Sequence, residues 1–322
     1  MRKLGLVFPG QGTQYVGMGR ELYNAYSVAK EAFETAGDLL DCDLAGLCFG
    51  GPQEELDRTV NTQVSVLTVN FAIYRVYEQE IGIRPVIAAG HSLGEYNALL
   101  AAGALGFGEA LRLVHARGVF QQEAAPAGSG AMAAIIGLGR AAVEEICARV
   151  REMDGTVETS IVNTDEQIVV SGSARAVATA VAAAKDRGAR AKELPISVPC
   201  HCSMMNPAAD RFRSFLDGFE FGDFRFPVIP NADPDLLYSK ENARGLLYRQ
   251  IRTAVYWRET ILKMIAQGAD TFVELGPRRT LSGLIRRINP GVRTHSVEDA
   301  GSLEKTAAFL KGHGKEWRSA AE

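Results

Sequence analysis

A serine flanked by glycines is the first feature of this chain that could carry chemistry. The segment Gly90-His91-Ser92-Leu93-Gly94 has the spacing G-x-S-x-G. An apolar run at 85–89 precedes it and a helical pattern at 95–102 follows it, which predicts a strand, a tight turn and a helix. Small neighbours avoid clashes in such a turn, and the Leu93 N–H can face a developing oxyanion. The pattern predicts that Ser92 is a nucleophile; the alternative is an ordinary serine in a strand-to-helix turn.

A nucleophilic serine needs a base to take its proton, and the chain offers five histidines. His91 should point to the other side of the turn, His115 falls within a helical run, and His313 lies in a polar stretch near the end of the chain. His201 follows a Ser-Val-Pro stretch, in a loop where the chain returns to its larger part, and such loops often line clefts. From the residues alone, His201 and His295 stay open as alternatives for the base.

The elements that must position these residues follow two patterns. Short apolar runs alternate with helices in the first and last parts of the chain, which predicts a parallel α/β sheet. Between them, the order strand, helix, strand, strand, helix, strand is typical of a ferredoxin-like module. The predicted strands are 3–8, 85–89, 131–138, 157–163, 167–171, 190–196, 226–229 and 271–275, with Pro227 placing 226–229 at an edge; the predicted helices include 62–80, 95–102, 140–153, 174–187 and 259–267.

We therefore predict an α/β fold in which an α/β-hydrolase-like parallel sheet carries an inserted ferredoxin-like subdomain. The expected boundaries are 1–127 and 198–310 for the large domain and 128–197 for the small one. The polar segment 311–322 is expected to be a loose C-terminal tail.

Composition excludes several classes of function. The 322 residues carry a formal net charge of -3, which does not favour nucleic acid as a partner, and no run of about eighteen apolar residues predicts a membrane span. Five scattered cysteines favour reduced thiols and a cytoplasmic location over a disulfide framework. Cys200-His201-Cys202 lacks a second pair of ligands at metal-binding spacing, so we expect neither a metal nor a bound cofactor.

Six motifs occur in a fixed order: Phe8-Pro-Gly-Gln-Gly-Thr-Gln14, Gly90-His-Ser-Leu-Gly-Glu95, Arg117-Gly118, Ser197-Val-Pro-Cys-His-Cys202, Gln250 with Trp257, and Glu274-Leu-Gly-Pro277. The chain resembles the malonyl-CoA:acyl carrier protein transacylases and the related acyltransferase domains of fatty acid and polyketide synthases over about residues 3–290. The resemblance implies transfer of a malonyl group from malonyl-CoA to an acyl carrier protein through an acyl-serine.

The resemblance also implies catalytic roles. Ser92 attacks the thioester, and His201 acts as general base and then as general acid. The main-chain carbonyl of Gln250 orients the imidazole in place of a carboxylate. The main-chain N–H groups of Gln11 and Leu93 form the oxyanion hole.

A further set of residues concerns the acyl group. Arg117 is implied as the partner of the malonyl carboxylate, because a guanidinium matches a carboxylate in a planar, bidentate way. Gln63 is implied as a supporting residue. Gln121 stands where methionine is common in the family, and Cys200 stands where the free-standing malonyl enzymes usually carry serine. These departures leave the chemistry intact and make the acyl specificity the open question.

The expected partner is an acyl carrier protein, whose class is acidic, and the enzyme is expected to be a monomer. Basic side chains that could face the carrier are Arg190, Lys192, Arg278, Arg279, Arg286 and Arg287. Three alternatives stay open: a discrete acyltransferase of a polyketide or malonate pathway, a serine acyl hydrolase, and a non-catalytic binding module.

Overall fold

A five-stranded sheet forms the centre of the larger part of the chain. In a computed structural model that describes residues 3–126, 128–196 and 198–312, the strands are β1 (Leu4–Phe8), β2 (Ile87–Gly90), β7 (Val228–Ile229), β8 (Thr271–Leu275) and β9 (Arg293–Val297). Their order is β7-β2-β1-β8-β9, and β1 pairs in parallel with β2 and β8, as β8 does with β9. β1 is buried at every position, as a central parallel strand with both faces covered must be.

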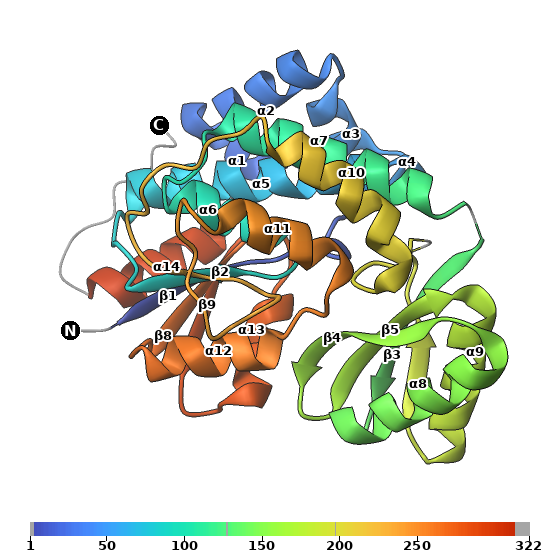
Figure 1. Cartoon of the computed structure of the whole chain (residues 1–322). Coiled ribbons are helices and arrows are strands. Elements are labelled where there is room, and N and C mark those ends of the chain that lie inside the picture. The colour runs from blue at the N-terminus through green and yellow to red at the C-terminus, as the bar shows by residue number, and fades with distance from the viewer. Residues whose placement is uncertain (1–2, 127, 197, 313–322) are drawn as a thin grey trace. The chain divides into compact units, whose positions relative to one another are not determined.

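Helices follow the strands and cover the sheet. α5 (Thr59–Glu80) and α6 (Gly94–Ala101) lie on one face and α13 (Thr280–Ile288) on the other (Figure 1). α14 (Ala300–Lys311) begins with a capping box in which Asp299 and Ser302 bond each other's backbone N–H groups. The remaining helices before the second sheet are α1 (Arg20–Ala25), α2 (Ser27–Leu40), α3 (Leu44–Gly50), α4 (Gln53–Leu56) and α7 (Phe107–Ala124).

A second, antiparallel sheet has four strands: β3 (Gly130–Ile136), β4 (Val157–Thr164), β5 (Gln167–Ser173) and β6 (Arg190–Glu193). Its order, β4-β5-β3-β6, is the ferredoxin-like arrangement. α8 (Arg140–Asp154) and α9 (Ala174–Asp186) pack together on this sheet around one aliphatic core (Figure 1). The predicted fold class, a parallel α/β sheet with an inserted ferredoxin-like module, is confirmed.

The chain divides into two compact units. The first comprises Met1–His115, Gly222–Val228 and Met264–Glu322, and holds the parallel sheet. The second comprises Ala116–Phe221 and Ile229–Lys263, and adds to the small sheet the 3-10 turn Ser203–Met205, α10 (Asn206–Leu216), α11 (Ala243–Arg252) and most of α12 (Trp257–Ala266). A parallel bridge from Ile161 to Val255 joins β4 to the segment after α11.

Some predicted boundaries differ from the observed ones. The strand predicted at 190–196 ends at Glu193, because Pro195 has no N–H to donate to a neighbouring strand. Pro227 does place β7 at the sheet edge, with only two residues. The subdomain boundary at 128–197 stays a prediction. The expected loose tail lies mostly outside the described residues, and Lys311 ends α14. In the part of the chain that is described, no helix is both long enough and apolar enough to cross a bilayer.

Candidate active site

Ser92 occupies a strained turn between β2 and α6. Its φ of 51° lies in the left-handed region, which costs a residue other than glycine about 1–3 kcal/mol. The turn is held by backbone bonds from His91 N to Phe8 O (2.9 Å), from Gly94 N to His91 O (3.0 Å) and from Glu95 N to Ser92 O (3.0 Å). Strain of this kind in a strand-to-helix turn is the expected geometry of an exposed nucleophile.

Two glycines allow the backbone to approach closely at this turn. A Cβ on Gly94 would lie 2.1 Å from the carbonyl oxygen of Phe8, and a Cβ on Gly10 would lie 2.3 Å from that of His91. The same position on Gly10 is only 3.4 Å from the Leu93 nitrogen. The backbone at Gly10 and Gln11 therefore lies beside the start of α6, where the first N–H groups of a helix have no partner within the helix.

The loop that carries Gln11 is fixed from three sides. Inside the loop, the Thr13 hydroxyl donates to Gly10 O (2.8 Å). Asn70 of α5 donates through Nδ2 to Pro9 O (2.9 Å), and Arg278 donates through Nε to Thr13 O (3.2 Å). Both contacts bridge residues far apart in the chain, so no local pattern could have indicated Asn70 or Arg278 as supports. Arg278 was predicted as a possible contact for the carrier protein. Its bond to Thr13 O shows that it also supports the loop of Gln11.

Glu274 lies near the end of β8, and its carboxyl group accepts hydrogen bonds from the first turn of α13. Its side chain is fully buried, and its two carboxyl oxygens accept hydrogen bonds from Leu281 N (2.9 Å) and Ser282 N (2.7 Å). Burial raises the pKa of this carboxyl to about 7, although the two N–H donors oppose the rise. The motif that contains Glu274 therefore supports the turn that follows β8.

His201 lies in the second unit, in a loop with a φ of 61°, and is buried. Its Nδ1 is 2.8 Å from the main-chain oxygen of Gln250, and its own N–H donates to Ile251 O (3.2 Å). A carbonyl oxygen can only accept, so Nδ1 carries a proton, and in the neutral imidazole Nε2 is the acceptor. The neutral imidazole therefore has the tautomer that a general base requires.

Arg117 is buried in the same unit, on α7. Its Nη1 donates to Gln121 Oε1 (3.2 Å) and its Nη2 to Gln250 Oε1 (3.3 Å). Burial raises the pKa of the Cys200 thiol to about 11, and the positive charge of Arg117 opposes this rise. The second unit thus brings together Arg117, Gln121, Cys200, His201 and Gln250.

Other predicted residues lie elsewhere. His295 is on β9, stacked on Phe309 with ring centroids 3.9 Å apart. The sheet order puts three inter-strand steps, roughly 14 Å, between β9 and the strand that leads to Ser92, which excludes His295 as its base. His313 lies outside the described residues. Gln63 is fully buried on α5, in the unit that carries Ser92.

The Cys200-His201-Cys202 segment has no metal-binding geometry in the described chain. The Cys202 thiol donates to Pro199 O (3.1 Å), and burial raises its pKa to about 11. Over residues 3–126, 128–196 and 198–312, no group of three or more His, Cys, Asp or Glu side chains is arranged to hold a metal ion.

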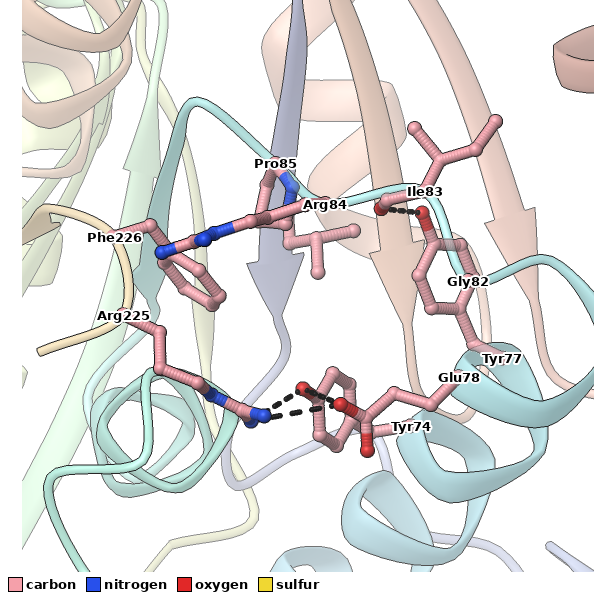
Figure 2. A pocket seen from close by; sticks show the side chains of 10 residues that line it. Tyr74, Tyr77, Glu78, Gly82, Ile83, Arg84, Pro85, Arg225 and Phe226 are labelled. Carbon is pink, nitrogen blue, oxygen red and sulfur yellow. Dashed lines mark hydrogen bonds and ion pairs between the residues drawn. The ribbon is translucent and has the colours of Figure 1, made fainter.

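A cavity of about 280 Å³ lies at the other end of the parallel sheet (Figure 2). Its lining includes Pro85 and Phe226, which precede β2 and β7, whereas Ser92 follows β2. Arg225 and Glu78 meet at its wall, where the hydroxyl of Tyr74 donates to Glu78 (2.5 Å) and accepts from Arg225 (3.0 Å). This cavity is therefore separate from Ser92.

Comparison with known proteins agrees with these features. A family model for the acyl transferase domain matches residues 6–306. The malonyl CoA-acyl carrier protein transacylases of Bacillus subtilis and Escherichia coli (strain K12) are 42% and 43% identical to this chain, over 97% and 94% of it and 98% of each relative. The solved transacylase of Coxiella burnetii superposes with a TM-score of 0.93 at 40% identity, covering 97% of this chain and 98% of that one. A malonyl-transacylase in complex with its type II PKS acyl-carrier protein gives 0.92 at 42% identity, covering 95% and 98%. The chain therefore belongs to the malonyl CoA-acyl carrier protein transacylase family, within the wider acyl transferase domain family.

Proposed function

We propose that this enzyme transfers a malonyl group from malonyl-CoA to the phosphopantetheine thiol of an acyl carrier protein, through an ester on Ser92. The observation that carries the proposal is the turn at Ser92, where a residue with a side chain is held at a φ of 51° against glycines that admit no Cβ. Such strain persists only where the surrounding structure imposes it, and it presents the hydroxyl to a substrate.

The reaction proceeds in two half-reactions. In the first, Ser92 Oγ attacks the thioester carbonyl of malonyl-CoA while His201 Nε2 takes the hydroxyl proton. The negative charge on the tetrahedral intermediate is stabilised by the N–H groups of Gln11 and Leu93, each worth about 3 kcal/mol in the barrier. The C–S bond then breaks, and His201 returns the proton to the coenzyme A sulfur.

In the second half-reaction the carrier thiol attacks the Ser92 ester. His201 takes the thiol proton and passes it to Ser92 Oγ as the ester bond breaks. Arg117 binds the free carboxylate of the malonyl group in both halves. Its burial supports this role, because a charge pair is stronger when water is excluded.

The test is incubation with malonyl-CoA and a holo carrier protein, followed by intact-mass measurement of both proteins. We expect a malonyl adduct on the enzyme that moves to the carrier, and no adduct in Ser92→Ala. An adduct that persisted in Ser92→Ala would refute the mechanism. Arg117→Ala should lose most activity with malonyl-CoA and gain relatively with acetyl-CoA; equal losses with both would refute the carboxylate role.

The same assay separates the alternatives. A hydrolase would release malonate without a carrier, and a binding module would form no adduct. Sequence identity does not decide which type of carrier protein accepts the malonyl group. This chain is 42% identical to the PKS-associated transacylase and 42% identical to the Bacillus subtilis relative. Transfer rates to a fatty-acid and a polyketide carrier protein would decide between the pathways.

We also propose that the enzyme acts as a monomer in the cytoplasm. All five cysteines are free thiols, which fits a reducing compartment. Light scattering with and without the carrier protein tests the monomeric state.

A further inference from the structure

Two glutamine side chains hold the guanidinium of Arg117. Gln121 lies one helical turn after Arg117 on α7, so the two side chains share a face of that helix. Gln250 approaches from α11. Gln121 Oε1 accepts from Nη1 at 3.2 Å and Gln250 Oε1 accepts from Nη2 at 3.3 Å. Both terminal nitrogens of the guanidinium are therefore bonded to amide oxygens.

All three side chains are removed from solvent. Arg117 is 1% exposed, and Gln121 and Gln250 are fully buried. An arginine side chain loses up to about 2 kcal/mol of conformational entropy when its rotamer is fixed. Hydrogen bonds that fix it before a substrate arrives remove that cost from the binding step. A methionine at position 121 could fill the same space, but its thioether sulfur is a much weaker hydrogen-bond acceptor than an amide oxygen.

From this geometry we infer that Gln121 is a positioning residue that raises the preference of this enzyme for acyl groups with a free carboxylate above the preference that Arg117 alone provides. Together with the Gln250 side chain, it holds the Arg117 fork in one plane, ready for bidentate pairing. The inference rests on the proposed function, in which Arg117 binds the malonyl carboxylate. It goes beyond that function in giving the side chains of Gln121 and Gln250 a role in selection and none in acyl-transfer chemistry.

The test compares kcat/KM for malonyl-CoA and acetyl-CoA in Gln121→Met and Gln250→Met. Gln250→Met keeps the main-chain carbonyl that orients His201. Loss of one hydrogen bond to a buried charge should lower the malonyl-to-acetyl ratio of kcat/KM roughly tenfold, mainly through KM for malonyl-CoA. Gln121→Glu places a carboxylate beside Arg117 that competes with the substrate, so the ratio should fall by about a hundredfold.

The matched control is Gln122→Met, the same change at the next, half-buried position on α7. A step of one residue points its side chain about 100° away from Gln121, so the ratio should stay within twofold of wild type. If Gln121 has only a structural role, Gln121→Met should lower the activities with malonyl-CoA and acetyl-CoA by the same factor. An unchanged malonyl-to-acetyl ratio in Gln121→Met and Gln250→Met would overturn the inference. An equal fall of the ratio in Gln122→Met would overturn it as well. If wild type forms no malonyl adduct on Ser92, the proposed function itself falls, and that result is read before any variant is made.

Discussion

The buried carboxyl of Glu274 makes the stability of this enzyme depend on pH in a defined direction. Its pKa rises from 4.5 to about 7 on folding, because burial disfavours the charged form and the nearby Glu298 adds to the effect. The folded protein therefore holds this proton more tightly than the unfolded chain does. The contribution of Glu274 to the free energy of unfolding is fully present below pH 4.5 and is lost as pH rises through about 7.

The magnitude follows from the size of the rise. At about 1.4 kcal/mol per pH unit, a pKa raised from 4.5 to about 7 corresponds to about 3 kcal/mol. Glu274→Gln is neutral at every pH, so it removes this dependence. We expect the free energy of unfolding of wild type, minus that of Glu274→Gln, to fall by about 3 kcal/mol between pH 4.5 and pH 8.

Urea unfolding followed by circular dichroism at half-unit pH steps measures this difference. Glu304→Gln, at an exposed position on α14, reports the effect of removing one surface charge. A difference that is flat across this range would refute the reasoning. It would mean that the N–H groups of Leu281 and Ser282 stabilise the carboxylate enough to cancel the cost of burying it.

Three further predictions concern the backbone and the thiols. Gly94→Ala should cost about 3 kcal/mol or more in the free energy of unfolding, because its Cβ would lie 2.1 Å from Phe8 O; a loss below 1 kcal/mol in urea unfolding would contradict the close approach. Gly245→Ala, inside α11 with open space around it, should instead stabilise by about 1 kcal/mol, and any loss would count against that helix assignment. A thiol reagent should label Cys42 first in the native protein, because the other four cysteines are buried; burial and nearby aspartates raise the pKa of Cys42, so the rate should increase above pH 8. Detection by mass spectrometry of rapid labelling at a second thiol would refute this prediction.

Local patterns were enough to predict the elements around Ser92. The strand before Ser92 and the helix after it were visible because the glycines and the apolar run lie within fifteen residues of one another. The ferredoxin-like module was likewise visible from its alternating elements. Ser173 caps α9 through a bond from Ala176 N, a short-range signal of the same kind.

Contacts between distant segments could not be read in the same way. Nothing near Asn70 or Arg278 in the sequence indicates that they fix the loop of Gln11, because those contacts depend on how α5 and β8 pack beside β1. The choice between His201 and His295 also required the strand order, which places β9 at the far edge of the sheet. The catalytic roles themselves stay predictions until the variants are measured.

The bond between His201 and Gln250 has a consequence for how this enzyme can evolve. The atom that orients the imidazole is a main-chain oxygen, and all twenty amino acids supply one at position 250. Most point mutations there therefore keep the acceptor, whereas an aspartate in the same role is lost in a single step. Substitutions at position 250 therefore change the contact with Arg117 but keep the main-chain acceptor for His201, which is the base in the proposed mechanism. Under the proposed roles, new acyl preferences are accessible through variants that remain active.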